Sequence, residues 1–129
     1  MKLDNALGIH EQALQLRARR AEVLAANIAN ADTPGYKARD FDFQAMLKEE
    51  VANSSRMKVT QSGHIQTETG MVPPSRMEYR TPTQPSLDGN TVDTQVEHTA
   101  FAANALEYQA SLKFLGGRIK SLMTAIKGQ

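Results

Sequence analysis

The sequence predicts a mainly α-helical protein whose two long terminal helices pack as a coiled-coil-like pair beside a polar middle. Apolar residues recur at helical spacing near both ends, whereas four of the five prolines fall between residues 73 and 85. Mean hydropathy is −0.46 and tryptophan is absent, so a thin core is expected. We therefore expect the chain to be fully ordered only in an assembly, where other subunits cover its apolar faces.

The first expected element is one amphipathic helix from about Leu3 to Asn30. Its apolar positions fall on one side of an α-helix, which is the pattern of a packing face. Four of them recur every seven residues and are expected to mediate helix packing: Leu7, Leu14, Ala21 and Ile28. With the turn that follows it, this helix forms the first expected unit of the chain, residues 1–36.

A definite stop follows the helix at Thr33-Pro34-Gly35-Tyr36. Proline presets φ at the second position of a type II turn, and glycine takes the positive φ of the third position without steric cost. The helix must end before Pro34, because proline disfavours helical geometry in the residue before it. Asn27 and Asn30 lie on one helical side just before this turn, where their amides could bond its backbone or a neighbouring subunit.

The expected middle unit, residues 37–90, is polar and mostly irregular. A short helix is expected over Phe41 to Val51. Two short runs, "MKVTQ" and "HIQTE", flank Ser62-Gly63 and predict a small β-hairpin. Prolines then exclude regular structure as far as Asp88-Gly89-Asn90.

The last expected unit, residues 91–129, is a second long helix with Asp93 or Thr94 as its cap and Gly128 at its end. Its apolar residues alternate spacings of four and three, as in a heptad seam. This predicted seam contains Phe101, Ala105, Tyr108, Leu112, Leu115, Ile119, Leu122 and Ile126. Gly116 and Gly117 interrupt it, which indicates either a close approach or a bend.

Charge and residue content point away from several functional classes. Lys and Arg number 15 against 14 Asp and Glu, a balance unlike that of proteins bound mainly through nucleic-acid phosphates or anionic lipid. Cysteine is absent, and the three histidines are scattered without metal-ligand spacing. We therefore expect no enzyme activity, no cofactor and no metal site. Residues 1–22 contain no continuous apolar run of the kind that a cleaved signal peptide needs.

A DNA-binding helix-turn-helix is the alternative interpretation of the N-terminal region. Arg17, Arg19 and Arg20 could contact phosphates, with Lys37 and Arg39 nearby. Against this, no second apolar helix of sufficient length follows the turn, and residues 1–39 carry only six basic groups against four acidic groups.

Two motifs resemble the axial proteins of the bacterial flagellar rod and hook. The stretch "ANIANADTPGY" is similar to their N-terminal signature, and the matching residues are Asn27, Asn30, Thr33, Pro34, Gly35 and Tyr36. Near the other end, a DGN-x-VD element and an N-x-L-x-Y element are similar to those of proximal-rod members. They contain Asp88, Gly89, Asn90, Val92, Asp93, Asn104, Leu106 and Tyr108. His98 departs from the family pattern, which commonly has methionine there.

The resemblance implies a structural subunit of the proximal rod that polymerises through its terminal helices into a hollow drive shaft. It implies export by the flagellar type III apparatus without a cleaved signal, and a place in the basal-body rod in the periplasmic space. The implied partners in this helical hetero-assembly are the rod subunits FlgC, FlgF and FlgG, the adaptor FliE and the export gate. Neither nucleic acid nor a small-molecule substrate is implied.

One further motif concerns export. Phe43 and Leu47 match a Phe-x-x-x-apolar pattern that rod and hook subunits are thought to present to the export gate. Ordinary packing of an amphipathic helix produces the same spacing, so both interpretations stay open.

Overall fold

Helices dominate the chain, as predicted. The computed structural model describes residues 2–56, 76–82 and 86–128. In chain order its elements are α1 (Lys2–Ala29), β1 (Arg39–Asp40), α2 (Phe43–Arg56), β2 (Glu78–Tyr79) and α3 (Thr94–Lys127). The expected mainly α-helical fold class is therefore confirmed.

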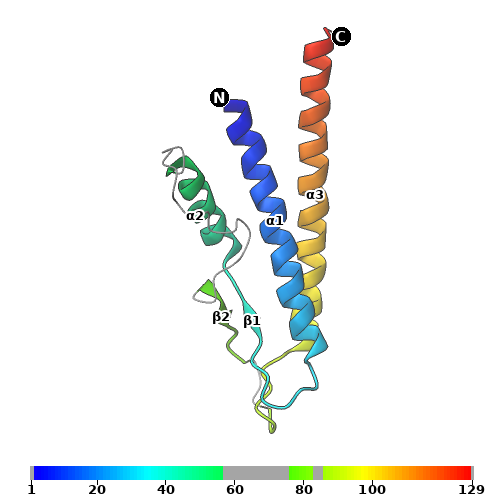
Figure 1. Cartoon of the computed structure of the whole chain (residues 1–129). Helices are drawn as coiled ribbons and strands as arrows, with labels where there is room; N and C mark the ends of the chain where they lie inside the picture. The colour runs from blue at the N-terminus through cyan, green and yellow to red at the C-terminus, as the bar shows by residue number, and fades with distance from the viewer. Residues whose placement is uncertain (1, 57–75, 83–85, 129) are drawn as a thin grey trace.

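The two long helices run in opposite directions, and α2 lies on the side of α1 away from α3 (Figure 1). The start of α1 and the end of α3 consequently lie at one end of the pair, and the turn after α1 and the start of α3 lie at the other (Figure 1). The α3 helix begins where the Asp93 carboxylate accepts the backbone N–H groups of Gln95 and Val96. It ends at Gly128, whose φ of 71° is the left-handed conformation that glycine adopts easily.

The short helix α2 begins later and ends later than the expected Phe41–Val51. Its start is set by Asp42, whose Oδ1 accepts the backbone N–H groups of Gln44 at 3.0 Å and Ala45 at 3.3 Å. A carboxylate that satisfies these free N–H groups acts as an N-cap, so Phe41 is excluded from the helix. At its other end the helix continues to Arg56.

The small antiparallel sheet pairs Arg39 with Tyr79 and Asp40 with Glu78. It joins segments far apart in the chain, so local spacing gave no sign of it. The backbone N–H of Arg80 extends the pairing by donating to the carbonyl of Ala38 at 3.0 Å. The hairpin predicted within residues 57–70 lies outside the described residues.

The apolar core lies between α1 and α2 and includes the segment that leads into α2. Its buried members are Ala13, Leu16, Phe41, Phe43 and Met46, with Val23, Leu47 and Met77 packed against them. The four residues expected to form the packing stripe of α1, namely Leu7, Leu14, Ala21 and Ile28, are only half-buried. The buried apolar cluster of α1 therefore faces α2, whereas the fully buried Leu24 lies outside this cluster.

The contact between α1 and α3 is polar where it is most buried. Glu97 and Asn104 are the buried residues of α3. Within the single chain, no residue of the predicted α3 seam is fully buried; Leu112 and Ile119 are 45% exposed and Ile126 is 84% exposed. An apolar coiled-coil-like pairing of the terminal helices is not confirmed, and the seam remains a prediction about the assembly.

We expect the Leu16→Ala variant to lower the free energy of unfolding by about 2–5 kcal/mol, because Leu16 is 2% exposed and its truncation leaves a cavity. Thermal unfolding followed by circular dichroism measures this effect. The matched Leu106→Ala variant removes an exposed leucine from α3 and is expected to change the value by less than about 0.5 kcal/mol. Equal effects of the two substitutions would contradict the assigned core.

Candidate functional site

Polar side chains from four parts of the fold meet between α1 and α3. We call this cluster the junction, and it consists of Arg20, Asn27, Asp40, Arg80 and Glu97. Arg20 and Asn27 come from α1, Asp40 from β1, Arg80 from the residue after β2, and Glu97 from the first turn of α3. The junction is therefore the place where the two motif-bearing ends of the chain and its middle are connected.

Asn27 lies at the centre of the junction and is fully buried. Its amide nitrogen donates to the carbonyl of Arg39 at 2.6 Å and to Oε2 of Glu97 at 3.0 Å. Its oxygen accepts the Arg39 N–H at 3.1 Å and the Tyr36 hydroxyl at 3.4 Å. A side chain here must therefore both donate and accept, which an amide does and a carboxylate does not.

Beyond the neutral Asn27, the acidic and basic side chains of the junction alternate. Glu97 is fully buried, and its Oε1 forms an ion pair with Arg80 Nε at 2.7 Å. Arg80 Nη2 also reaches Oδ2 of Asp40 at 2.8 Å. Arg20 donates two hydrogen bonds to the same Asp40 carboxylate, at 3.1 and 3.0 Å. The hydrogen bond to Asp40 is the main cause that raises the pKa of Arg20.

The turn after α1 has the geometry that its sequence predicts. Gly35 has a φ of 72°, and the N–H of Tyr36 donates to the carbonyl of Thr33 at 3.3 Å, as at the third and fourth positions of a type II turn. Asn30 closes the preceding helix: its amide donates to the carbonyl of Ala26, and its oxygen accepts the Thr33 hydroxyl.

The DGN element near α3 binds this same turn. The amide nitrogen of Asn90 lies 2.8–3.0 Å from three backbone carbonyl oxygens, those of Asn30, Ala31 and Thr33. Gly35 donates its N–H to the carbonyl of Asp88 at 2.8 Å. The two sequence motifs, which lie far apart in the chain, are therefore the two halves of one structural unit.

Two details fit the DGN element to that turn. Gly89 has a φ of 78°, and a Cβ added there would lie 3.7 Å from the Cα of Gly35. The Ser86 hydroxyl and the Asn90 N–H both donate to the Asp88 carboxylate, and these bonds lower its pKa. The element is thus arranged as a tight loop that presents the Asn90 amide to the end of α1.

A second polar contact joins the helices farther along. The Asn104 amide donates to the carbonyl of Arg17 at 2.9 Å, and the Arg17 guanidinium pairs with Glu107. The same guanidinium lies over the Phe43 ring, 4.1 Å from its centroid, so it also connects α3 to the core near α2.

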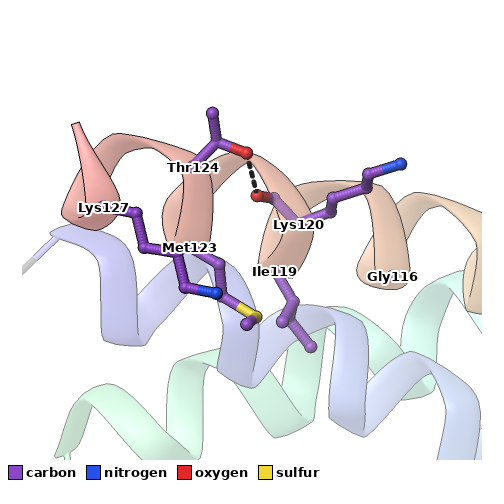
Figure 2. Close-up of a pocket in the computed structure, with 6 residues that line it drawn as sticks. All are labelled: Gly116, Ile119, Lys120, Met123, Thr124 and Lys127. Carbon is purple, nitrogen blue, oxygen red and sulfur yellow. Dashed lines mark hydrogen bonds between the residues drawn. The ribbon is translucent and has the colours of Figure 1, made fainter. Parts of the chain in front are cut away.

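Beyond this contact, the C-terminal half of α3 has an exposed apolar face. A hollow of about 450 Å³ is lined by Gly116, Ile119, Lys120, Met123, Thr124 and Lys127. In Figure 2 the side chains of Ile119 and Met123 point toward the side on which α1 lies, whereas Lys120 and Thr124 point away. A Cβ added at Gly116 or Gly117 would meet no heavy atom of the described residues within 4 Å.

The basic residues considered for DNA binding have partners within the chain. Arg20 pairs with Asp40, and Arg19 pairs with Glu22. Lys37 donates to the carbonyl of Gly89, while the Arg39 guanidinium lies 5.4 Å from the centre of the Tyr79 ring. With Arg17 bound to Glu107 and Phe43, these five cations do not form a free surface for phosphates.

We did not predict from the sequence that the charged residues of the junction lie together, although the spacing of one of them indicates that it is buried. Glu97, Phe101, Asn104 and Tyr108 are spaced by four, three and four, so Glu97 and Asn104 occupy the same helical stripe as the predicted seam. Polar residues at such positions indicate a buried polar partner on the facing helix. Arg80 and Asp40 gave no comparable signal, because their meeting depends on the β1–β2 pairing.

Phe43 is buried and Leu47 is partly buried against the core. Both residues therefore belong to the packed contact between α1 and α2. Within residues 2–56, 76–82 and 86–128, no helix has the length and apolar content to cross a membrane, and no three His, Cys, Asp or Glu side chains are grouped to hold a metal.

Comparison with known proteins gives a consistent result. Residues 7–37 match the family model described as "Flagella basal body rod protein". The chain is 49% identical over 132 residues to the flagellar basal body rod protein FlgB of Escherichia coli (strain K12), covering 98% of this chain and 96% of the relative. It is 45% identical over 131 residues to that of Aeromonas hydrophila, covering 100% and 98%. These relatives give no support to a DNA-binding module.

We expect Asn27→Asp to destabilise the junction by about 3–5 kcal/mol, because it replaces a donor with a second carboxylate 3.0 Å from Glu97 in a buried site. Urea unfolding measures the loss. Gln109→Glu also replaces an amide with a carboxylate, but at an exposed position of α3, and is expected to have little effect. Parent-like stability of the Asn27→Asp variant would show that the amide is not required.

Proposed function

Because the chain belongs to the FlgB family of flagellar basal body rod proteins, it is a structural subunit of the rod, and we propose that its terminal helices mediate polymerisation into the hollow shaft. Near-complete coverage of relatives at 45–49% identity supports the family assignment. The observation that carries the proposed assembly mode is the apolar face of α3, which the single chain leaves exposed along the C-terminal half of the helix.

The geometry of that face favours another helix as its partner. At 100° per residue, its apolar residues fall within an arc of about 80°, which is the width of a helix-packing stripe. They are Leu112, Leu115, Ile119, Leu122 and Ile126. Such a stripe, half-exposed in one subunit, becomes buried when helices of neighbouring subunits lie alongside.

Charge beside the stripe adds a constraint on the partner. Lys113, Lys120 and Lys127 recur every seven residues along one edge, Arg118 lies beyond the other edge, and no acidic residue follows Glu107. Like charges brought together at an interface are unfavourable. The facing surface in the rod is therefore apolar at its centre and neutral or acidic where it meets these lysines.

The junction holds the N-terminal end of α3 in place. Its buried hydrogen bonds hold the first turns of α3 against α1, while the C-terminal half of α3 extends beyond the Arg17–Glu107 contact. The proposal retains three units, residues 1–36, 37–90 and 91–129. The first and last units build the shaft through their helices and become fully ordered only there, because covering the α3 stripe offsets the entropy lost on ordering.

The route to the rod follows from the same family membership. We propose export by the flagellar type III apparatus without a cleaved signal, across the inner membrane to the rod in the periplasmic space. Phe43 and Leu47 would be available to the export gate in an unfolded chain and buried once α2 packs on α1. Beyond assembly with other rod components, the proposed neighbours are FlgC, FlgF and FlgG, the adaptor FliE and the gate itself.

We expect Ile119→Asp to abolish rod assembly while changing the stability of the isolated subunit much less, because Ile119 is 45% exposed in the single chain and would become fully buried only between subunits. Counting rods in purified basal bodies measures assembly, and thermal unfolding measures stability. Ser121→Asp places the same charge on the opposite side of α3 and should assemble normally. Rods formed equally well by both variants would contradict helix-mediated assembly.

Gly35→Val tests whether the turn has a role in the rod. A β-branched residue at a φ of 72° is strained by about 1–2 kcal/mol, although no described atom would contact its Cβ. We expect loss of rods and of swimming with secretion of the subunit retained, since the direction of the chain leaving α1 changes. Gly8→Ala, in a helix with space around it, is the control. Normal motility in Gly35→Val would reduce the turn to a simple helix stop.

A further inference from the structure

The charge balance of the junction depends on one residue of the middle segment. Arg20 and Arg80 supply two positive charges, and Asp40 and Glu97 supply two negative charges. Arg20 donates two hydrogen bonds to Asp40, and Glu97 has Arg80 as its ion-pair partner. Without Arg80, two carboxylates would share the charge of Arg20, which is hydrogen-bonded to Asp40, and the fully buried Glu97 would retain the neutral Asn27 amide as its side-chain hydrogen bond.

The position of Arg80 in the chain couples the junction to the small sheet. Arg80 follows β2 directly, and its backbone N–H donates to Ala38 beside β1. Its guanidinium is therefore held at the junction by the β1–β2 pairing. Glu97, by contrast, belongs to the first turn of α3, so its carboxylate reaches the junction only when α3 packs on α1.

We propose that α3 packs stably on α1 only when the middle segment is in place, with β2 paired to β1 and the Arg80 guanidinium beside Glu97. We call this role of Arg80 a latch. A buried carboxylate without its cation is strongly unfavourable, so α3 packs stably only after β2 has paired with β1 and delivered the guanidinium. The pairing of β2 and the packing of α3 consequently form one cooperative step. This inference concerns closure of the single chain and does not depend on the proposed assembly mode.

A purely structural role for Arg80 gives a different expectation. If the residue only anchors β2 to the surface of α1, its loss frees β2 and leaves α3 in place, because Asn104 in the helix and Asn90 just before it keep their own hydrogen bonds to α1 and to the turn after α1. The latch instead requires that both elements respond to one substitution, and that the response of α3 depends on the charge of Glu97.

Hydrogen exchange measured on the full chain separates these cases. In Arg80→Gln, amides of β2 and amides in the first turns of α3 should both exchange at least about tenfold faster than in the parent. Arg76→Gln is the matched control, since Arg76 lies four residues earlier and pairs with Glu49 at the surface. Its exchange rates should stay within about twofold of the parent at both places.

The double variant Arg80→Gln with Glu97→Gln provides the decisive comparison. A neutral glutamine needs no cation and can still accept from Asn27, so protection of α3 should return to within about threefold of the parent while β2 stays fast. The latch is refuted by three results: α3 unaffected in Arg80→Gln, α3 not rescued in the double variant, or a parent chain whose β2 and α3 amides are both unprotected.

Discussion

The fully buried contact between Asn27 and Glu97 is the constraint around which the rest of the structure is arranged. A carboxylate without access to water requires donors and a cation, and the chain supplies them from separate places. α1 provides the amide and the segment after β2 provides the guanidinium. The end of α1, the start of α3 and the middle segment must therefore come together for these buried polar groups to find their partners.

The features that could be predicted from the sequence depend on local chemistry. The helical spacing of apolar residues, the proline before Gly35 and the caps at Asp93 and Gly128 each act within a few residues, so they indicated α1, its turn and the ends of α3. The start of α2 was misplaced because apolar spacing alone does not account for the capping side chain of Asp42. Asn27 and Asn30 stood out correctly as unusual helix residues, but their partners were not known.

The features that could not be predicted depend on contacts between distant segments. The pairing of Arg39 with Tyr79 and the ion pair between Arg80 and Glu97 join positions that have no relation in local sequence. The apolar periods also suggested that α1 and α3 meet through leucines. The buried residues that α3 contributes are instead Glu97 and Asn104, while Leu106 and Leu112 stay exposed and Leu115 and Leu122 are only partly buried. Periodicity identifies a stripe, but it does not identify what covers the stripe.

The glycine pair in α3 has a mechanical consequence. Gly116 and Gly117 have free space around them and no side chains to brace the helix, near the middle of the part that extends beyond the polar contacts with α1. Glycine is the residue whose helical backbone resists deformation least. When a rod bends, the helices on its inner and outer sides are strained unequally. Bending of α3 would then be concentrated at this glycine pair. The part of α3 held against α1 and the part beyond the glycines could then curve differently while each stays helical.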